Sequence, residues 1–418
     1  MSETIMFIGG IILGLLFAFL LFIFITIIIS YFNREKFDEF TPNVSIIIPC
    51  YNEEKNIGDC LESIYKSDYD LEKFEVLVVD DGSKDKTKNI VEDYQNKYSN
   101  LRLIKGEHKG KSASLNLGTE QAKHEFILTL DADTIIKEDA IGKILKPFGK
   151  KDVGATNGSC MVKNKNTILS LFQNMEYIYN NLIRKSFSDM FKNGIWFFGA
   201  FACYRKSVLE KIGYFKKHTL TEDMDIALEI YSSGYRVINV HDAYGYTIVP
   251  ITLSAFFKQR TRWWLGVLQS LNKSKKLFSR KSSPSILFLF VNQYWWTFYA
   301  LISLPLIAYQ YSFWLVHNTN TFTELFMYTF RWFTFLGPIH VIYMIPEWGI
   351  SFFSIFGVLS GIISVGMMIY ALYLFGHKLN VKNIIVLFFY FPYCIVLNLT
   401  ITFSLLRALI FKKSYFIS

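Results

Sequence analysis

Residues 126–133 read FILTLDAD, a short run typical of a buried strand followed at once by two carboxylates on alternate positions. A second run of this kind, residues 74–83, reads FEVLVVDDGS and also passes from apolar residues to acids. Ligands of open parallel sheets bind at the carboxyl ends of the strands. The acids that follow the two runs therefore predict a site at one edge of a sheet.

Strand and helix patterns alternate around these runs. The β-branched run VSIIIP and the shorter run LRLI predict two further strands, with helices in the connections. The expected strands are residues 44–49, 74–79, 101–104 and 126–130, and the expected helices are residues 56–67, 86–98 and 111–123. Alternation of this kind indicates an α/β fold with a mostly parallel sheet and helices on both faces.

The composition predicts a membrane portion beside this domain. Of 418 residues 51% are hydrophobic, too many for an ordinary soluble protein, and residues 5–30 carry no charge. A bilayer core needs about 20 apolar residues in a helix. A secretory signal peptide is the alternative, but it usually has a basic start and a shorter apolar core. Because Arg34 and Lys36 follow the run, we expect a retained anchor with its N-terminus outside.

Four more apolar stretches lie in the C-terminal third, at residues 286–316, 325–345, 350–375 and 384–411. The second contains Arg331 and His340 and could be re-entrant, because buried charge in lipid is costly. The count is therefore three or four spans. We expect four, which places the basic residues before Pro284 and the pair Lys412-Lys413 on the same inner side.

The net charge of +9 does not indicate nucleic-acid binding. A cluster without acids lies directly before an apolar stretch and comprises Lys273, Lys275, Lys276, Arg280 and Lys281. Such a cluster is a topology signal and a contact for anionic headgroups, and no aromatic-interleaved basic motif accompanies it. The five cysteines have no paired metal-binding spacing, so we expect buried, reduced side chains.

The acidic motifs suggest metal and proton chemistry. Asp131 and Asp133 offer the hard oxygen ligands that Mg²⁺ or Mn²⁺ shares with substrate phosphates, although a solvated turn is the alternative for this pattern alone. Thr221-Glu222-Asp223 precedes a helical stretch at residues 224–232 and could be an N-cap with acids in the first turn. Asp223 is also a candidate base for an attacking hydroxyl.

Two basic motifs suggest phosphate and sugar contacts. Lysine near a helix N-terminus is unfavourable for the helix dipole, so a phosphate partner is one explanation for Lys111, and an exposed basic loop is the equally open alternative. Residues 259–264 read QRTRWW within an amphipathic pattern over residues 253–271. A helix in the membrane interface explains tryptophan with arginine. A guanidinium also clamps a diphosphate, and an indole makes a platform for a sugar ring.

In this order the motifs resemble the inverting family-2 glycosyltransferases, over residues 44–268. The resemblance is to the membrane-embedded processive β-glycan synthases that make cellulose, chitin and hyaluronan, and most of all to the poly-β-1,6-N-acetylglucosamine synthases. The shared motifs are PCYNE (49–53), VDDGS (79–83), KGKSASLN (109–116), DAD (131–133), QNMEY (173–177), IGYF (212–215), TED (221–223), VP (249–250) and KQRTRW (258–263). The chain departs from many relatives at residues 196–201, WFFGAF, where they carry Ser-Gly.

The resemblance implies a role for each motif residue. Nucleotide-sugar binding would fall to Tyr51, Glu53, Asp81, Lys111, Asp131 and Arg262. Gln259 and Trp263 would bind the acceptor glycan. Asp133 would bind Mg²⁺ or Mn²⁺, and Asp223 would be the catalytic base.

The expected organisation follows. Residues 1–32 form a transmembrane helix, residues 33–252 a cytosolic GT-A (Rossmann-like) domain, residues 253–284 an amphipathic interface helix with a basic segment, and residues 285–418 the C-terminal membrane helices. Such a protein of the plasma membrane would polymerise a β-linked glycan from a UDP-sugar, with N-acetylglucosamine favoured, and pass it across the bilayer. A small membrane partner subunit is left open. Transfer of one sugar to a lipid carrier and a scaffold without turnover are the alternatives.

Overall fold

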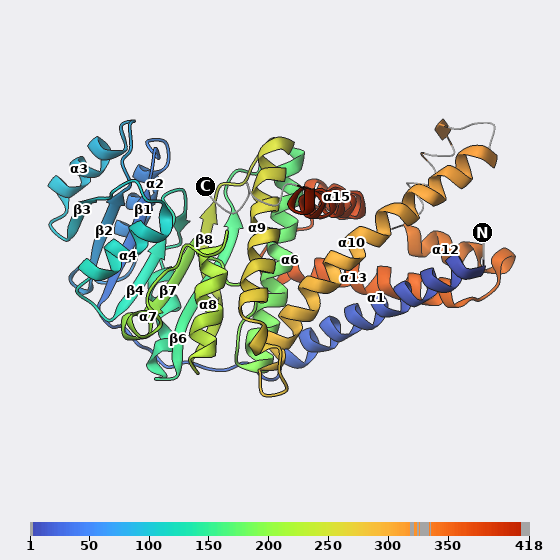
Figure 1. The fold of residues 1–418 in the computed structure, drawn as a ribbon, viewed down its shortest axis with the longest axis horizontal. Helices are drawn as coiled ribbons and strands as arrows, with labels where there is room; N and C mark the ends of the chain where they lie inside the picture. Colours follow the sequence, from blue (N-terminus) through green and yellow to red (C-terminus); the bar gives the residue numbers. More distant parts are fainter. Residues whose placement is uncertain (1–2, 318–321, 324–325, 327–333, 335, 411–418) are drawn as a thin grey trace.

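The computed structural model describes residues 3–317, 322–323, 326, 334 and 336–410. A sheet flanked by helices forms one end of the molecule, and long helices point away from it at the other end (Figure 1). Two helices, α6 (Ile168–Phe191) and α9 (Leu253–Lys273), lie between the two parts (Figure 1). The chain therefore joins its two halves through a layer of helices.

The first half of the sheet is parallel, as the sequence predicts. Strand β1 (Val44–Cys50) pairs in parallel with β2 (Phe74–Asp80) and with β4 (Phe126–Leu130). Strand β3 (Leu101–Lys105) pairs in parallel with β2. Because these strands run in one direction, the acids that follow β2 and β4 emerge at the same edge of the sheet.

The second half of the sheet contains antiparallel as well as parallel pairs, so the whole sheet is mixed. Strand β7 (Phe201–Arg205) pairs antiparallel with β4 and with β6 (Val153–Val162). Strand β8 (Arg236–Thr247) pairs in parallel with β6, and the short β5 (Ile135–Ile136) pairs antiparallel with β8. The complete order is β3-β2-β1-β4-β7-β6-β8-β5. These four later strands are not among the predicted ones.

Helices cover both faces of the sheet, as the alternation predicts. The shorter ones are α2 (Ile57–Tyr65), α3 (Thr87–Lys97), α4 (Lys111–Gln121), α5 (Ala140–Leu145), α7 (Lys206–Ile212) and α8 (Glu222–Ser232). Alternate residues of β1 point into two hydrophobic cores: Ile47 packs in the same core as Leu115 of α4, while Ile46 and Ile48 belong to the core that contains α2. Burial on both faces is why the strands read as continuous apolar runs.

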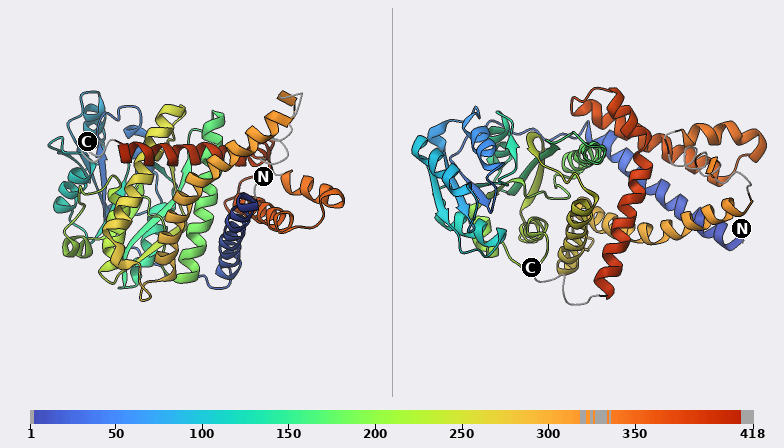
Figure 2. Two further views of the ribbon diagram at one scale, coloured as in Figure 1. Left: turned by 45° about the vertical axis from the view of Figure 1, so that its right-hand side comes forward. Right: turned by 90° about the horizontal axis from the view of Figure 1, so that it is seen from above.

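The long helices form the membrane portion. Among the described residues, four helices are long and apolar enough to cross a bilayer. They are α1 (Glu3–Ser30), α10 (Pro284–His317), α13 (Phe352–Leu374) and α15 (Tyr390–Ile410). They correspond to the predicted N-terminal anchor and to the first, third and fourth C-terminal stretches, and they indicate a membrane protein. In Figure 2, α15 crosses over α10 near the interface layer.

Two shorter helices, α12 (Gly337–Trp348) and α14 (Val381–Phe388), accompany the long ones. The second apolar stretch, residues 325–345, lies partly outside the described residues, and residues 337–345 of it belong to α12, so the choice between three and four C-terminal spans stays a prediction. Four of the five free cysteines are buried and Cys394 is half-buried. This agrees with the expected role of the cysteines as small buried side chains.

Candidate active site

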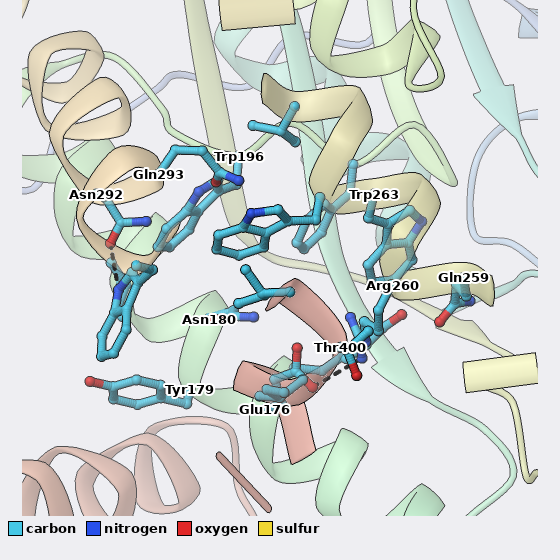
Figure 3. A pocket seen from close by; sticks show the side chains of 18 of the residues that line it. Glu176, Tyr179, Asn180, Trp196, Gln259, Arg260, Trp263, Asn292, Gln293 and Thr400 are labelled. Atoms are coloured by element: carbon cyan, nitrogen blue, oxygen red, sulfur yellow. Dashed lines mark hydrogen bonds and ion pairs between the residues drawn. The ribbon is translucent and has the colours of Figure 1, made fainter. Parts of the chain in front are cut away.

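A cavity of about 700 Å³ extends from the carboxyl ends of the strands, past α6 and α9, to the membrane helices. Its sheet end is lined by Lys111, Asp131, Asp133, Glu222 and Asp223. Figure 3 shows the other walls, where side chains from α6, α9, α10 and α15 point toward a common space. One cavity therefore connects the predicted acidic site to the membrane portion.

Three predicted nucleotide-binding residues lie in the loops at the same sheet edge, outside the cavity lining. The Asp81 carboxylate accepts hydrogen bonds from the backbone N–H groups of Lys109 (3.0 Å) and Gly110 (2.7 Å), which holds the loop before α4 in place. The Tyr51 ring lies 4.8 Å from the His108 ring, centroid to centroid. Glu53 Oε2 accepts a hydrogen bond from the Asn56 side chain at 2.8 Å.

His108 is a neighbour that the sequence did not single out. Its Nδ1 lies 2.8 Å from the backbone oxygen of Asp81, and its φ of 53° is in the left-handed region. Both features place the imidazole beside Tyr51 and Asp81. The only sequence feature that could have pointed to this placement of the imidazole is the position of His108 just before Lys109-Gly110-Lys111.

Lys111 lies between two carboxylates. Its Nζ is 2.6 Å from Asp131 Oδ1 and 3.2 Å from Glu222 Oε1. Burial alone lowers a lysine pKa, but the charges of Asp131 and Glu222 outweigh it and raise the pKa of Lys111. The ammonium is therefore permanently charged at the place where a bound diphosphate would need a cation.

Asp133 is suited to a divalent cation. Its Oδ1 accepts hydrogen bonds from the hydroxyls of Thr134 (3.2 Å) and Thr247 (3.4 Å). Burial and then the charges of Asp131 and Glu53 raise the pKa of Asp133 to about 6, so a cation beside it would relieve repulsion. The described residues contain no group of three or more His, Cys, Asp or Glu side chains arranged around a metal. Mg²⁺ and Mn²⁺ fit such a site when phosphates and water supply the remaining ligands.

Asp223 and Glu222 differ sharply in their surroundings. Asp223 Oδ2 accepts a hydrogen bond from the backbone N–H of Gly199 at 2.8 Å. Burial and then the charge of Glu222 raise the pKa of Asp223 to about 6. Burial also disfavours ionised Glu222, but Lys111 and Arg262 outweigh it and lower the pKa of Glu222. Asp223 is therefore the carboxylate of the pair that can accept a proton near neutral pH.

Thr221 occupies the predicted N-cap position of α8, but its side chain makes no capping hydrogen bond in the described part of the chain. Its hydroxyl oxygen is buried and finds no hydrogen-bond partner among the described residues. The side chain instead packs on Gly266 of α9, where a Cβ atom would come within 2.6 Å of it. The close approach brings α8, which carries Glu222 and Asp223, against the helix that carries the QRTRWW motif.

Motif residues of α9 line the cavity. Gln259, Arg262 and Trp263 all line it, and Gln259 Oε1 is buried with no hydrogen-bond partner in the part of the chain that the structure describes. The Trp263 ring lies 6.4 Å from the Tyr177 ring of α6, centroid to centroid. An available amide oxygen beside an indole is the combination that binds sugar hydroxyls and sugar rings.

Seven of the ten predicted site residues thus line one cavity: Lys111, Asp131, Asp133, Asp223, Gln259, Arg262 and Trp263. The sequence assigned no role to several other lining residues, among them Glu176, Tyr177, Trp196, Phe198 and Arg260. Trp196 and Phe198 belong to the segment that departs from many relatives. Glu176, Tyr177 and Arg260 lie within the QNMEY and KQRTRW motifs, but the motifs did not show that α6 and α9 bring them together.

Comparison with known proteins agrees with this geometry. Residues 45–213 match the model of the glycosyl transferase family 2. Poly-beta-1,6-N-acetyl-D-glucosamine synthases from Staphylococcus epidermidis and Staphylococcus aureus are 32% and 31% identical over 226 and 227 residues. These alignments cover 53% of this chain and 54% of each relative, so the chain spans about half the length of the curated relatives it matches.

A solved structure shows the same fold. A mannosyltransferase from Pyrobaculum calidifontis in complex with GDP-Man and Mn²⁺ superposes with a TM-score of 0.54 at 21% identity. The match covers 85% of this chain and 99% of that one. The predicted GT-A fold with added membrane helices is thereby confirmed.

The contact between α8 and α9 generates a stability prediction. Gly266→Ala should lower the free energy of unfolding by about 1–3 kcal/mol, because the added methyl group overlaps the stiff Thr221 side chain. The thermal midpoint of the detergent-solubilised protein measures this. Gly58→Ala in α2 is the matched control, since its nearest neighbour would be 3.9 Å away. Adding Thr221→Ala to Gly266→Ala removes the two atoms at 2.6 Å but keeps the Cβ atom at 3.0 Å, so it should restore part of the lost midpoint. A midpoint as low as that of Gly266→Ala alone would contradict the proposed overlap.

Proposed function

We propose that this chain, whose residues 45–213 match the family-2 glycosyltransferases, polymerises a β-linked glycan from a UDP-sugar. The single observation that carries the proposal is the continuous cavity. It joins a charged site for a nucleotide-sugar to an indole platform and then continues among the membrane helices. A site for one soluble acceptor would not need this extension.

The residues at the sheet end of the cavity can each take one role in an inverting sugar transfer. Lys111 and Arg262 are placed to hold the diphosphate through charge-assisted hydrogen bonds. Asp223 is placed to take the proton of the acceptor hydroxyl as its oxygen attacks the anomeric carbon opposite the leaving UDP. Mg²⁺ or Mn²⁺ held by Asp133 would neutralise charge on the diphosphate. The Mn²⁺ of the structurally similar mannosyltransferase supports a divalent ion here.

The membrane end of the cavity supports polymerisation with translocation. Polar side chains from three helices line it: Asn180, Asn292, Gln293, Asn398 and Thr400. Polar groups inside a membrane portion are costly and usually functional. Gln293 is 3% exposed and its Nε2 has no hydrogen-bond partner within the described ranges, so a passing sugar hydroxyl could satisfy it. Trp296 and Tyr299 add aromatic surface to the same wall.

The relatives suggest the sugar and the location. Because the curated relatives are poly-β-1,6-N-acetylglucosamine synthases, we propose UDP-N-acetylglucosamine as the donor. The four apolar helices place the protein in a membrane, and we propose the cell membrane with the catalytic domain in the cytosol. Whether a small membrane subunit assists stays a prediction.

The direct test is UDP release by the purified full-length protein with a panel of UDP-sugars and Mg²⁺ or Mn²⁺. We expect UDP-N-acetylglucosamine to yield a long polymer on a sizing gel. A single-sugar lipid product would instead establish the lipid-carrier alternative. No UDP release with any donor, while UDP still binds, would favour the scaffold alternative.

Asp223→Asn should lower the transfer rate by about 10²- to 10⁴-fold, because the variant cannot accept the acceptor proton. UDP binding, measured by calorimetry, should stay close to that of the wild type. Asp225→Asn on the same helix is the matched control, since Asp225 bonds to Lys273 at 2.8 Å and does not line the cavity. Near-normal turnover in Asp223→Asn would show that another group is the base.

The pH profile gives an independent prediction for the same residue. Asp223 must be deprotonated to act as a base, and its pKa is raised to about 6. Turnover should therefore fall as the pH drops through about 6, in a profile measured with saturating Mg²⁺ or Mn²⁺ so that Asp133 stays ionised. The residual activity of Asp223→Asn should lack this fall. A profile that is flat from pH 5 to 8 in the wild type would contradict the assignment.

A further inference from the structure

Glu176, which belongs to the QNMEY motif, lies at the centre of a buried network that has no part in the catalytic proposal. Its Oε2 accepts a hydrogen bond from Arg260 Nη2 at 3.0 Å and another from the Tyr393 hydroxyl. The side chains of Arg260 and Glu176 are only 10% and 13% exposed, and Tyr393 is buried. One carboxylate oxygen thus joins α6, α9 and the membrane helix α15.

The network reaches the platform through Arg260. The guanidinium lies 4.5 Å from the centroid of the Trp263 ring, a cation–π contact, and 5.1 Å from that of Phe256. Figure 3 shows Glu176 bonded to Arg260, with the Trp263 indole close to it and facing the cavity. Arg260 thus contacts both the Glu176 carboxylate and the Trp263 indole.

Two more residues of QRTRWW attach α9 to the membrane helices. The Thr261 hydroxyl is hydrogen-bonded to the Ser404 hydroxyl of α15 at 2.7 Å. Trp264 Nε1 donates to the Thr297 hydroxyl of α10 at 3.1 Å. Thr261 and Trp264 therefore fix α9 to two of the long apolar helices, and Trp264 also lines the cavity.

A buried ion pair of this kind is a weak source of folding stability, so its presence is better explained by a role in fixing how the helices pack. Apolar residues of similar volume can replace such pairs with little loss, whereas removal of one partner leaves a buried charge unpaired. Pairs that are retained can instead specify one arrangement of the packed elements. Here the pair joins α6 to α9, the helix that carries the Trp263 indole.

We propose that Glu176 is a positioning residue for the acceptor glycan. Through Arg260 it sets the orientation of Trp263, and through Tyr393 it keeps α9 in register with α15, so that the end of the bound glycan stays in line with Asp223. This inference rests on the proposed function. It assigns to Glu176, Arg260 and Tyr393 the control of acceptor affinity and product length, with no part in donor binding.

The test uses the full-length protein with Glu176→Gln. We expect about a tenfold weaker affinity for a β-1,6-linked N-acetylglucosamine tetramer, measured without donor, and a shorter polymer in the assay. The KM for UDP-N-acetylglucosamine and the affinity for UDP should not change. Tyr393→Phe removes only one hydroxyl and should act in the same direction with a smaller effect, so it serves if Glu176→Gln fails to fold.

Asp189→Asn is the matched control. Asp189 pairs with Lys185 at 2.8 Å on the same helix, and the two side chains are 10% and 13% exposed, as in the Arg260–Glu176 pair. Neither lines the cavity. This control should lower the thermal midpoint without changing tetramer affinity or product length.

The outcomes separate the two proposals. A wild type that binds the tetramer and makes polymer, with Glu176→Gln unchanged or altered to the same degree as Asp189→Asn, would overturn the positioning role alone. A change in the KM for the donor without a change in tetramer affinity would also overturn it. A wild type that neither binds the tetramer nor makes polymer would overturn the proposed function and this inference together.

Discussion

The ammonium of Lys111 is the charge on which the arrangement of the site depends. It stands at the start of α4 and contacts Asp131 after β4 and Glu222 at the start of α8, so it joins three elements at one sheet edge. Without it, the carboxylates of this edge would repel one another without a nearby cation. Its charge also contributes to the different pKa values of the two acids of α8. It helps lower the pKa of Glu222, whereas burial and the charge of Glu222 raise the pKa of Asp223.

Helix α9 connects this site to the long apolar helices α10 and α15. It approaches α8 closely because Gly266 has no side chain, and it is held on the other side by hydrogen bonds to α10 and α15. An amphipathic helix in the interface explains its tryptophans and arginines only in part. Both arginines line the cavity, but Arg260 is buried and paired with Glu176 whereas Arg262 is exposed, so two arginines of one motif have different surroundings.

The strands and helices nearest the N-terminus were predictable because their patterns are local. Residues 44–49, 74–79, 101–104 and 126–130 are apolar runs bounded by turns, and the structure has strands there within one residue at each end. Strands β6, β7 and β8 were not predicted. They lie next to one another in the order β7-β6-β8. Polar and small residues such as Asn157 and Gly158 in β6 interrupt the apolar pattern by which a strand is recognised in a sequence.

The sequence alone determined the chemical groups and their order: acids after strands, lysine at a helix start, and glutamine, arginine and tryptophan on one helix. Spacing along strands and helices is a local property, so the sequence is enough to assign the acids to a common sheet edge. Only the tertiary structure decided which groups meet. Lys111 lies 111 positions before Glu222, and Glu176 is 84 positions from Arg260 and 217 from Tyr393. Contacts at such separations arise from the packing of whole elements, and no pattern within one element encodes them.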